Sequence, residues 1–171
     1  FEHVAAFEFN ELFCKTLRKN RPEWKVFGPP TGSGDVSKTS EVIAALERII
    51  PVNFEGVFAG GPPCQPFSIA SNQRFSKSGV NFKRVGFDHE KNGNLLFDYV
   101  SIIKHFRPAC FLIENVPGLR DLDGGEQLSA AIKDLQNVGY EIENPTVLNA
   151  ADYSVPQFRD RLFVVGTRTN R

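Results

Sequence analysis

The stretch ACFLIEN, residues 109–115, decides the fold, because small and apolar residues run without a break into Glu114 and Asn115. A short run that is apolar at every position is typical of a strand covered on both faces, as in a parallel sheet. Such sheets place their ligands beyond the carboxyl ends of their strands. The polar pair Glu114–Asn115 stands at that end, so the sequence predicts a site there.

Helical patterns alternate with further short apolar runs along the chain. Strands are predicted at 4–8, 56–59, 109–113, 140–148 and 161–167. Helices are predicted at 10–19, 40–50, 95–106 and 128–138. Asn10 is expected to cap the first helix and Gly139 to close the last. This alternation favours an α/β fold, with a mostly parallel sheet and helices on both faces.

The composition restricts the class of protein. The 171 residues are 41% hydrophobic, enough for one core, and 20 Lys and Arg balance 20 Asp and Glu. Zero net charge argues against a polycationic nucleic-acid binder, but not against an enzyme whose basic residues cluster locally. Three widely spaced cysteines form neither a disulfide framework nor a zinc motif, so a reducing compartment and no metal are expected. No apolar run reaches the roughly 18 residues of a membrane span.

Cys64 lies just past the strand at 56–59, in the segment GGPPCQPFS (residues 60–68). The prolines around it stiffen the backbone and remove amide donors. A single cysteine is usually a small buried hydrophobe, an interpretation that suits Cys110 in its strand and Cys14 in its helix. Proline-rich surroundings do not suit a core strand, so Cys64 is a candidate nucleophile.

Glu114 is the candidate acid. A carboxylate at a strand end is often only a solvated loop residue or a helix cap. Here the strand before it is apolar, and Val116–Gly118 after it predicts a tight turn rather than the start of a helix. A partly desolvated glutamate at that place is suited to proton donation.

Three segments in this order resemble the signature blocks of the cytosine-5 DNA methyltransferase family. They are GGPPCQPFS (60–68), ENVPGL (114–119) and QFRDRLFVVG (157–166). Weaker similarity is found at Glu8, at Gly34–Asp35 and in GNLLFDYV (93–100). The resemblance covers nearly the whole chain and implies a Rossmann-like S-adenosylmethionine-dependent methyltransferase fold. Because the family's first strand, its Phe-x-Gly-x-Gly cofactor loop and its target-recognition domain are not found within 1–171, we expect a partial catalytic domain.

The resemblance implies a covalent mechanism. Cys64 would attack carbon 6 of the target cytosine, which makes carbon 5 able to take the methyl group of S-adenosylmethionine. Glu114 would contact ring nitrogen 3 and the exocyclic amine, Arg161 would hold the carbonyl oxygen of the base, and Arg159 would buttress Glu114 and the loop. The group that removes the proton from carbon 5 stays open, and a water is one option. The target base would have to flip out of the duplex.

The resemblance also implies binding residues. Glu8 would accept hydrogen bonds from the cofactor ribose and Asp35 from its adenine amine. The adenine would pack on Phe9 and Val36, and the methionine end on Pro63 and Leu95. The nucleic-acid contacts would be Gln65, Ser68, Arg74, Lys83, Arg84, Asn115, Gln157 and Arg159. The residues alone leave simpler readings open: Asp35 as a turn residue, Leu95 as core, and the basic side chains as merely solvated.

The implied function is transfer of a methyl group to carbon 5 of cytosine in duplex DNA, by a DNA (cytosine-5-)-methyltransferase of a bacterial restriction–modification or orphan system. The expected partners are double-stranded DNA and a cognate restriction endonuclease, for a monomer in the cytoplasm or on the nucleoid. Two alternatives remain: methylation of tRNA, and an inactive DNA-binding scaffold. A nicotinamide-binding dehydrogenase ranks last, because no GxGxxG follows a strand.

Overall fold

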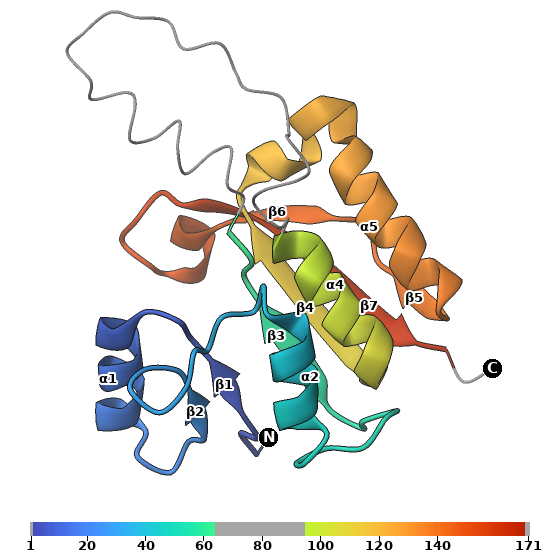
Figure 1. Cartoon of the computed structure of the whole chain (residues 1–171). Helices are drawn as coiled ribbons and strands as arrows, with labels where there is room; N and C mark the ends of the chain where they lie inside the picture. The colour runs from blue at the N-terminus through green and yellow to red at the C-terminus, as the bar shows by residue number, and fades with distance from the viewer. Residues whose placement is uncertain (1, 64–94, 170–171) are drawn as a thin grey trace, which may run out of the picture. The chain divides into compact units, whose positions relative to one another are not determined.

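The computed structural model describes residues 2–63 and 95–169, without the side chains of residues 122 and 123. The chain divides into two compact units, Phe1–Val52 and Asn53–Arg171. Figure 1 labels the helices and strands of both units. Strands and helices alternate along the chain, so the α/β class expected from the sequence is confirmed.

The first unit is built on two short parallel strands, β1 (Ala6–Phe7) and β2 (Val26–Phe27). Helix α1 (Glu11–Asn20) connects them, and helix α2 (Thr39–Leu46) follows β2. A helical connection is what parallel strands require, because a tight hairpin cannot join them.

Side chains at both ends of α1 hold this unit together. Asn10 caps the helix as predicted: its side-chain oxygen accepts hydrogen bonds from the backbone amides of Leu12 and Phe13 at 2.9 and 3.2 Å. At the other end, the guanidinium of Arg18 donates to three carbonyl groups between residues 26 and 29. These bonds fix the end of β2 against the helix.

The second unit carries the larger sheet. Its elements are β3 (Val57–Gly60), α4 (Leu95–Phe106), β4 (Cys110–Asn115), η1 (Pro117–Arg120), η2 (Leu122–Gly125), α5 (Glu126–Asn137), β5 (Tyr140–Ile142), β6 (Thr146–Asn149), η3 (Ala150–Tyr153) and β7 (Asp160–Arg168). The strand order is β3-β4-β7-β5, and β6 also pairs with β7. β3 and β4 are parallel, whereas β7 is antiparallel to β4, β5 and β6. The sheet of this unit is therefore mixed rather than mostly parallel.

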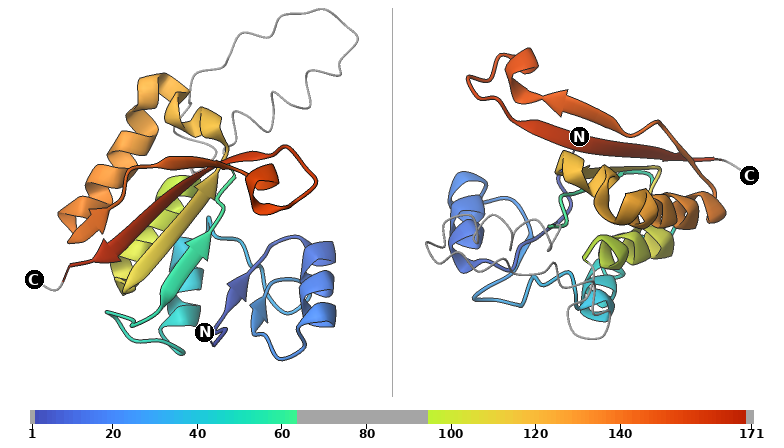
Figure 2. Two further views of the ribbon diagram at one scale, coloured as in Figure 1. Left: turned by 180° about the vertical axis from the view of Figure 1, so that it is seen from behind. Right: turned by 90° about the horizontal axis from the view of Figure 1, so that it is seen from above.

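The core of the second unit lies between its sheet and two helices. Figure 2 shows α4 and α5 on the same face of the sheet. The buried strand side chains that pack into this core are Phe111, Ile113, Tyr140, Leu162 and Val164. Burial alternates along β4: Phe111 and Ile113 are buried, whereas Cys110 and Leu112 are only partly so. The sequence suggests cover on both faces of β4, but within the described residues of this unit the helices cover one.

Two further details differ from the sequence prediction. The single strand predicted at 140–148 is two strands, β5 and β6, with Pro145 between them. Proline has no amide hydrogen for a strand ladder, which explains the interruption. The segment after β4 is a short 3-10 helix beginning at Pro117 rather than a simple turn. Gly139 does adopt the expected left-handed conformation after α5, with φ of 91°.

Candidate active site

Two charged side chains from neighbouring strands meet at the carboxyl end of β4. The Nε atom of Arg161 lies 2.7 Å from Oε1 of Glu114. Glu114 pairs with Phe163 across the antiparallel strands, so Arg161 is its diagonal neighbour on the same face of the sheet. The side chain of Glu114 remains 38% exposed. The carboxylate is therefore held in place and is still accessible.

The segment that leads to Cys64 runs beside this carboxylate. β3 is parallel to β4 with Gly60 opposite Ile113, so Gly61 follows alongside Glu114. A Cβ atom built on Gly61 would lie 2.8 Å from Oε2 of Glu114. A side chain at this position would displace the carboxylate, so glycine lets Glu114 keep its present position beside the segment.

Asn115 fastens the same segment to the end of β4. Its Nδ2 donates a hydrogen bond to the carbonyl oxygen of Pro62 at 2.8 Å, and its Oδ1 accepts one from the amide of Val116 at 2.8 Å. The side chain is only 5% exposed. Asn115 thus fixes the backbone two residues before Cys64.

Asn115, predicted to contact nucleic acid, makes its described hydrogen bonds within the chain, and the nucleic-acid contact stays a prediction. Side chains of a strand point alternately to opposite faces, so Asn115 lies on the buried face while Glu114 lies on the open one. Both polar atoms of its amide already have partners within the chain. These contacts connect the end of β4 to the segment at Pro62.

Gln157 and Arg159 lie in the exposed loop that follows η3 and precedes β7. The sequence suggests that Arg159 buttresses Glu114. Among the described residues this ion pair is made by Arg161 instead, because Arg161 belongs to β7 and faces Glu114 across the sheet. Arg159 precedes the strand, and its carbonyl oxygen accepts a hydrogen bond from the amide of Ala150 at 3.1 Å.

In the first unit, Glu8 follows directly on β1. Its Oε1 accepts a hydrogen bond from the amide of Asn10 at 2.7 Å, and its own amide donates to the carbonyl oxygen of Phe27 at 3.0 Å. The carboxylate is thereby oriented at the start of α1, where the helix dipole favours a negative charge. A fixed carboxylate of this kind can accept hydrogen bonds from the hydroxyl groups of a ribose.

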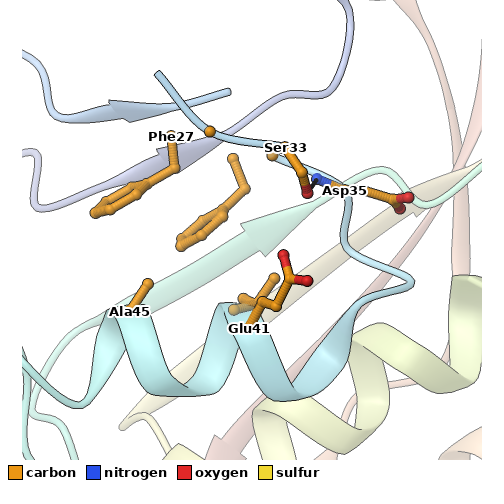
Figure 3. Close-up of a pocket in the computed structure, with 9 residues that line it drawn as sticks. Phe27, Ser33, Asp35, Glu41 and Ala45 are labelled. Carbon is orange, nitrogen blue, oxygen red and sulfur yellow. Dashed lines mark hydrogen bonds between the residues drawn. The ribbon is translucent and has the colours of Figure 1, made fainter. Parts of the chain in front are cut away.

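Asp35 lines a cavity of about 160 Å³ in the first unit, which Figure 3 shows. Its Oδ1 accepts hydrogen bonds from the backbone amide and the hydroxyl of Ser37, at 3.0 and 2.7 Å. The rings of Phe7 and Phe27, which both line the cavity, stack with their centroids 4.7 Å apart. The remaining lining residues are Gly32, Ser33, Gly34, Glu41, Val42 and Ala45.

These residues fit the adenosine part of a nucleoside cofactor, since aromatic rings pack on a base and carboxylates accept from its amine. The aromatic lining differs from the expectation. Phe9 and Val36, predicted to pack the adenine, do not line this cavity, and Phe9 is 68% exposed. Phe7 and Phe27 were missed. The available signal was that each is the last residue of an apolar run, just before a polar or glycine-rich segment.

The predicted nucleophile Cys64 and the predicted loop contacts Gln65, Ser68, Arg74, Lys83 and Arg84 lie outside the described residues. Pro63 and Leu95, predicted to line the methionine end of the cofactor, are described. Pro63 is exposed, and Leu95 is the first residue of α4 and partly buried. Their roles stay predictions.

Cys14 and Cys110 do not form a second reactive centre. Burial raises the pKa of both thiols, so they stay protonated at neutral pH, as expected for cysteines that only fill space. In residues 2–63 and 95–169, no cluster of His, Cys, Asp or Glu is arranged to hold a metal ion. No helix of this same part is long and apolar enough to span a bilayer.

The fold and the site together define a class of protein. In each unit charged side chains stand at the ends of strands, which is where α/β folds bind ligands: Glu8 follows β1 in the first unit, and Glu114 pairs with Arg161 at the end of β4 in the second. One solved structure with this fold is described as a DNA modification methyltransferase encoded within a prophage of Escherichia coli. It superposes with a TM-score of 0.69 at 24% identity, over 98% of this chain and 40% of that one. The Dnmt2 methyltransferase of S. pombe superposes with a TM-score of 0.63 at 18% identity, over 99% of this chain and 44% of that one. The fold is that of the S-adenosylmethionine-dependent methyltransferases.

The sequence narrows this class to one family. The family model of C-5 cytosine-specific DNA methylases matches residues 1–171, and the chain belongs to that family. The type II methyltransferase M.PspPI of Psychrobacter sp. is 36% identical over 170 residues, which is 99% of this chain. M.AquIA, a type II methyltransferase of Picosynechococcus sp., is 34% identical over 179 residues. The chain spans 35% of the length of the first relative and 65% of that of the second.

Proposed function

We propose that the protein transfers a methyl group to carbon 5 of cytosine in duplex DNA through a covalent adduct with Cys64. The observation that carries the proposal is the ion pair of Glu114 and Arg161, held beside the backbone of Gly61 at the carboxyl end of β4. An acid and a fixed cation next to the segment that bears a cysteine are the groups needed to activate a pyrimidine ring.

Each residue of the site has a separate role in the reaction. The Cys64 thiolate forms a bond to carbon 6, and the electron pair of the 5,6 double bond becomes available at carbon 5. Glu114 hydrogen-bonds or protonates ring nitrogen 3, which offsets the negative charge that builds up on the ring. Arg161 holds the carbonyl oxygen of the base. Carbon 5 forms a bond to the methyl group as the bond between that group and the sulfonium sulfur breaks, and S-adenosylhomocysteine leaves. A base then removes the proton from carbon 5, and the electron pair of that bond re-forms the 5,6 double bond and expels the Cys64 thiolate.

The cofactor is S-adenosylmethionine, which supplies an electrophilic methyl group when bound. Glu8 and Asp35 are oriented to accept hydrogen bonds from its ribose and adenine, and the stacked rings of Phe7 and Phe27 offer an apolar surface for the base. Pro63 and Leu95 are proposed for its methionine end. Carboxylate acceptors beside aromatic rings suit a nucleoside better than a phosphate, which would need cationic or amide donors.

Trapping of the covalent adduct tests this function. The protein, purified at its full natural length, is incubated with duplex DNA that contains 5-fluorocytosine and with S-adenosylmethionine. Fluorine at carbon 5 cannot leave as a proton does, so a methylated protein–DNA conjugate at Cys64 is expected by denaturing gel and mass spectrometry. Cys64→Ser is the control and should form no conjugate while binding the cofactor normally.

Two results would overturn the proposal. A conjugate on fluorinated tRNA but on no DNA would assign the protein to RNA methylation. No conjugate on either nucleic acid would favour the inactive scaffold over an enzyme.

The relatives support a proposal for the biological setting. Both relatives named above are type II methyltransferases, so we propose a role in restriction–modification or in orphan DNA methylation, with a cognate endonuclease as partner in the former case. The protein would then act as a monomer in the cytoplasm, where its DNA substrate is. Sequencing of methylated sites in the source genome tests the role, because a restriction–modification enzyme methylates nearly every copy of one short sequence.

A further inference from the structure

Phe158 is the most exposed large hydrophobic side chain among the described residues, with 91% of its surface accessible. Two apolar residues shortly before it in the sequence are also open: Tyr153, the last residue of η3, is 63% exposed, and Val155 is 45% exposed. Isolated exposed apolar residues are common on protein surfaces, but a nearly bare phenylalanine with apolar neighbours marks a contact surface.

The loop that carries Phe158 is held by its own hydrogen bonds. Asn149 caps η3 through the amide of Ala151 at 2.9 Å, and its Nδ2 donates to Oδ1 of Asp160 at 2.6 Å. The amide of Ala150 donates to the carbonyl oxygen of Arg159 at 3.1 Å, which closes the base of the loop. Phe158 is therefore presented to solvent by a defined frame.

The loop is continuous with the candidate active site. Phe158 stands three residues before Arg161, whose guanidinium contacts Glu114. Exposed Gln157 and Arg159 flank it on either side. A ligand large enough to reach beyond Glu114 along β7 would meet Phe158.

The exposed cation Arg159 gives the loop a group that can pair with an anionic ligand such as a nucleic acid. The carboxylate of Asp160 accepts a hydrogen bond from Asn149, and Arg161 is engaged with Glu114. Arg159 has no carboxylate partner among the described residues, so it is available to a phosphate. An exposed ring beside such a cation is the combination that proteins use to stack on bases while contacting the backbone.

We propose that Phe158 stacks on a nucleobase of the DNA substrate next to the target cytosine. The inference rests on the proposed function, because removal of a base from the duplex leaves the faces of its neighbours unstacked. An apolar ring placed there would cover a base face that otherwise meets water. Phe158 is thus a positioning residue for the substrate, and Arg159 contacts the backbone beside it.

The test compares two variants by their dependence on salt. The recognition sequence is first mapped by bisulfite sequencing of plasmid DNA methylated by the wild-type protein, and a labelled duplex of that sequence is used as the probe. Phe158→Ala should weaken binding about 5- to 150-fold with an unchanged salt slope, since stacking on one base is worth roughly 1–3 kcal/mol. Arg159→Ala should instead reduce the slope of log K against log salt by about one.

Controls separate this inference from the proposed function. Phe158→Trp should retain binding, and Val52→Ala, which trims another exposed apolar side chain (53% exposed), should leave binding and activity unchanged. Normal affinity of Phe158→Ala would overturn the stacking contact, and so would a large fall in its thermal midpoint, since Phe158 would then pack on protein. If the wild-type protein methylates no cytosine in DNA, the proposed function fails first.

Discussion

Arg161 stands diagonally across from Glu114 on paired strands, with 2.7 Å between its Nε and the carboxylate Oε1. Both residues belong to one sheet, so their alignment depends on strand pairing rather than on a loop. A base entering the site would meet an acid and a cation that are already oriented, which reduces the reorganisation needed during the reaction.

Replacing either member of this pair should slow methyl transfer. Glu114→Gln keeps the size of the side chain but removes its charge and its ability to donate a proton, so we expect the single-turnover rate to fall roughly 100-fold or more. Arg161→Ala should also slow the reaction. Because the two side chains act together, the rise in activation free energy in the double variant should be smaller than the sum of the rises in the two single variants. An unchanged rate in Glu114→Gln would mean that the carboxylate is only structural.

Gly61→Ala should act on the same carboxylate from the other side. The added Cβ would lie 2.8 Å from Oε2 of Glu114, so either the carboxylate or the backbone has to shift. We expect a loss of about tenfold or more in kcat, since small displacements of catalytic groups are costly. Combining the change with Glu114→Gln tests the cause: in that background Gly61→Ala should cost much less. If Gly61→Ala lowers kcat equally in the wild-type and Glu114→Gln proteins, the loss comes from a shift of the backbone rather than of the carboxylate.

Much of the candidate site could be predicted from the sequence, because each residue stands at a strand end or in a recognisable segment. Glu114 and Arg161 were both predicted as site residues, but not their contact. That contact depends on the register between two strands far apart in the sequence, which no local pattern specifies. For the same reason, the sequence assigned the buttressing role to Arg159, which precedes the strand.

Asn115 shows a second reason why site residues could not all be predicted from the sequence. It stands next to Glu114, so a reading by position places both in the site, yet the pleat of a strand sends adjacent side chains to opposite faces. The direction of the strands could not be predicted from the sequence either. The apolar pattern of 161–167 predicts a strand, but not that β7 runs antiparallel to all three of its partners.

Two buried tyrosines should respond differently to loss of their hydroxyl groups. The Tyr140 hydroxyl donates to the carbonyl oxygen of Pro108 at 2.7 Å, so Tyr140→Phe should destabilise the protein by about 1 kcal/mol. The Tyr99 hydroxyl is buried and finds no partner among the described residues, so Tyr99→Phe should be neutral or stabilising. Chemical denaturation measures both. Equal destabilisation by the two changes would contradict the assignment.

The same tyrosines predict a loss of stability at high pH. Burial raises the pKa of Tyr140 to about 12, and it also raises that of Tyr99. An unfolded tyrosine has a pKa of about 10, so below that pH both states are protonated and the stability is complete. Above it the unfolded chain loses its protons first, and the free energy of unfolding should fall as pH rises from about 10 towards 12. In Tyr140→Phe the free energy of unfolding should fall less steeply with pH than in the wild-type protein, as measured by denaturation at several pH values. An identical slope in the two proteins would show that Tyr140 is not the cause.

A substitution of Asn115 distinguishes a residue that positions the site from one that binds the substrate. Asn115→Asp retains an acceptor for the amide of Val116 but loses the Nδ2 group that donates to the carbonyl oxygen of Pro62. We expect kcat to fall at least tenfold, because the segment before Cys64 is no longer fastened beside Glu114, while the KM for DNA changes little. The rate of Cys64 alkylation by iodoacetamide, read by mass spectrometry, should change in parallel. A rise in the KM for DNA at unchanged kcat would instead make Asn115 a substrate contact, and would require its buried side chain to turn outwards on binding.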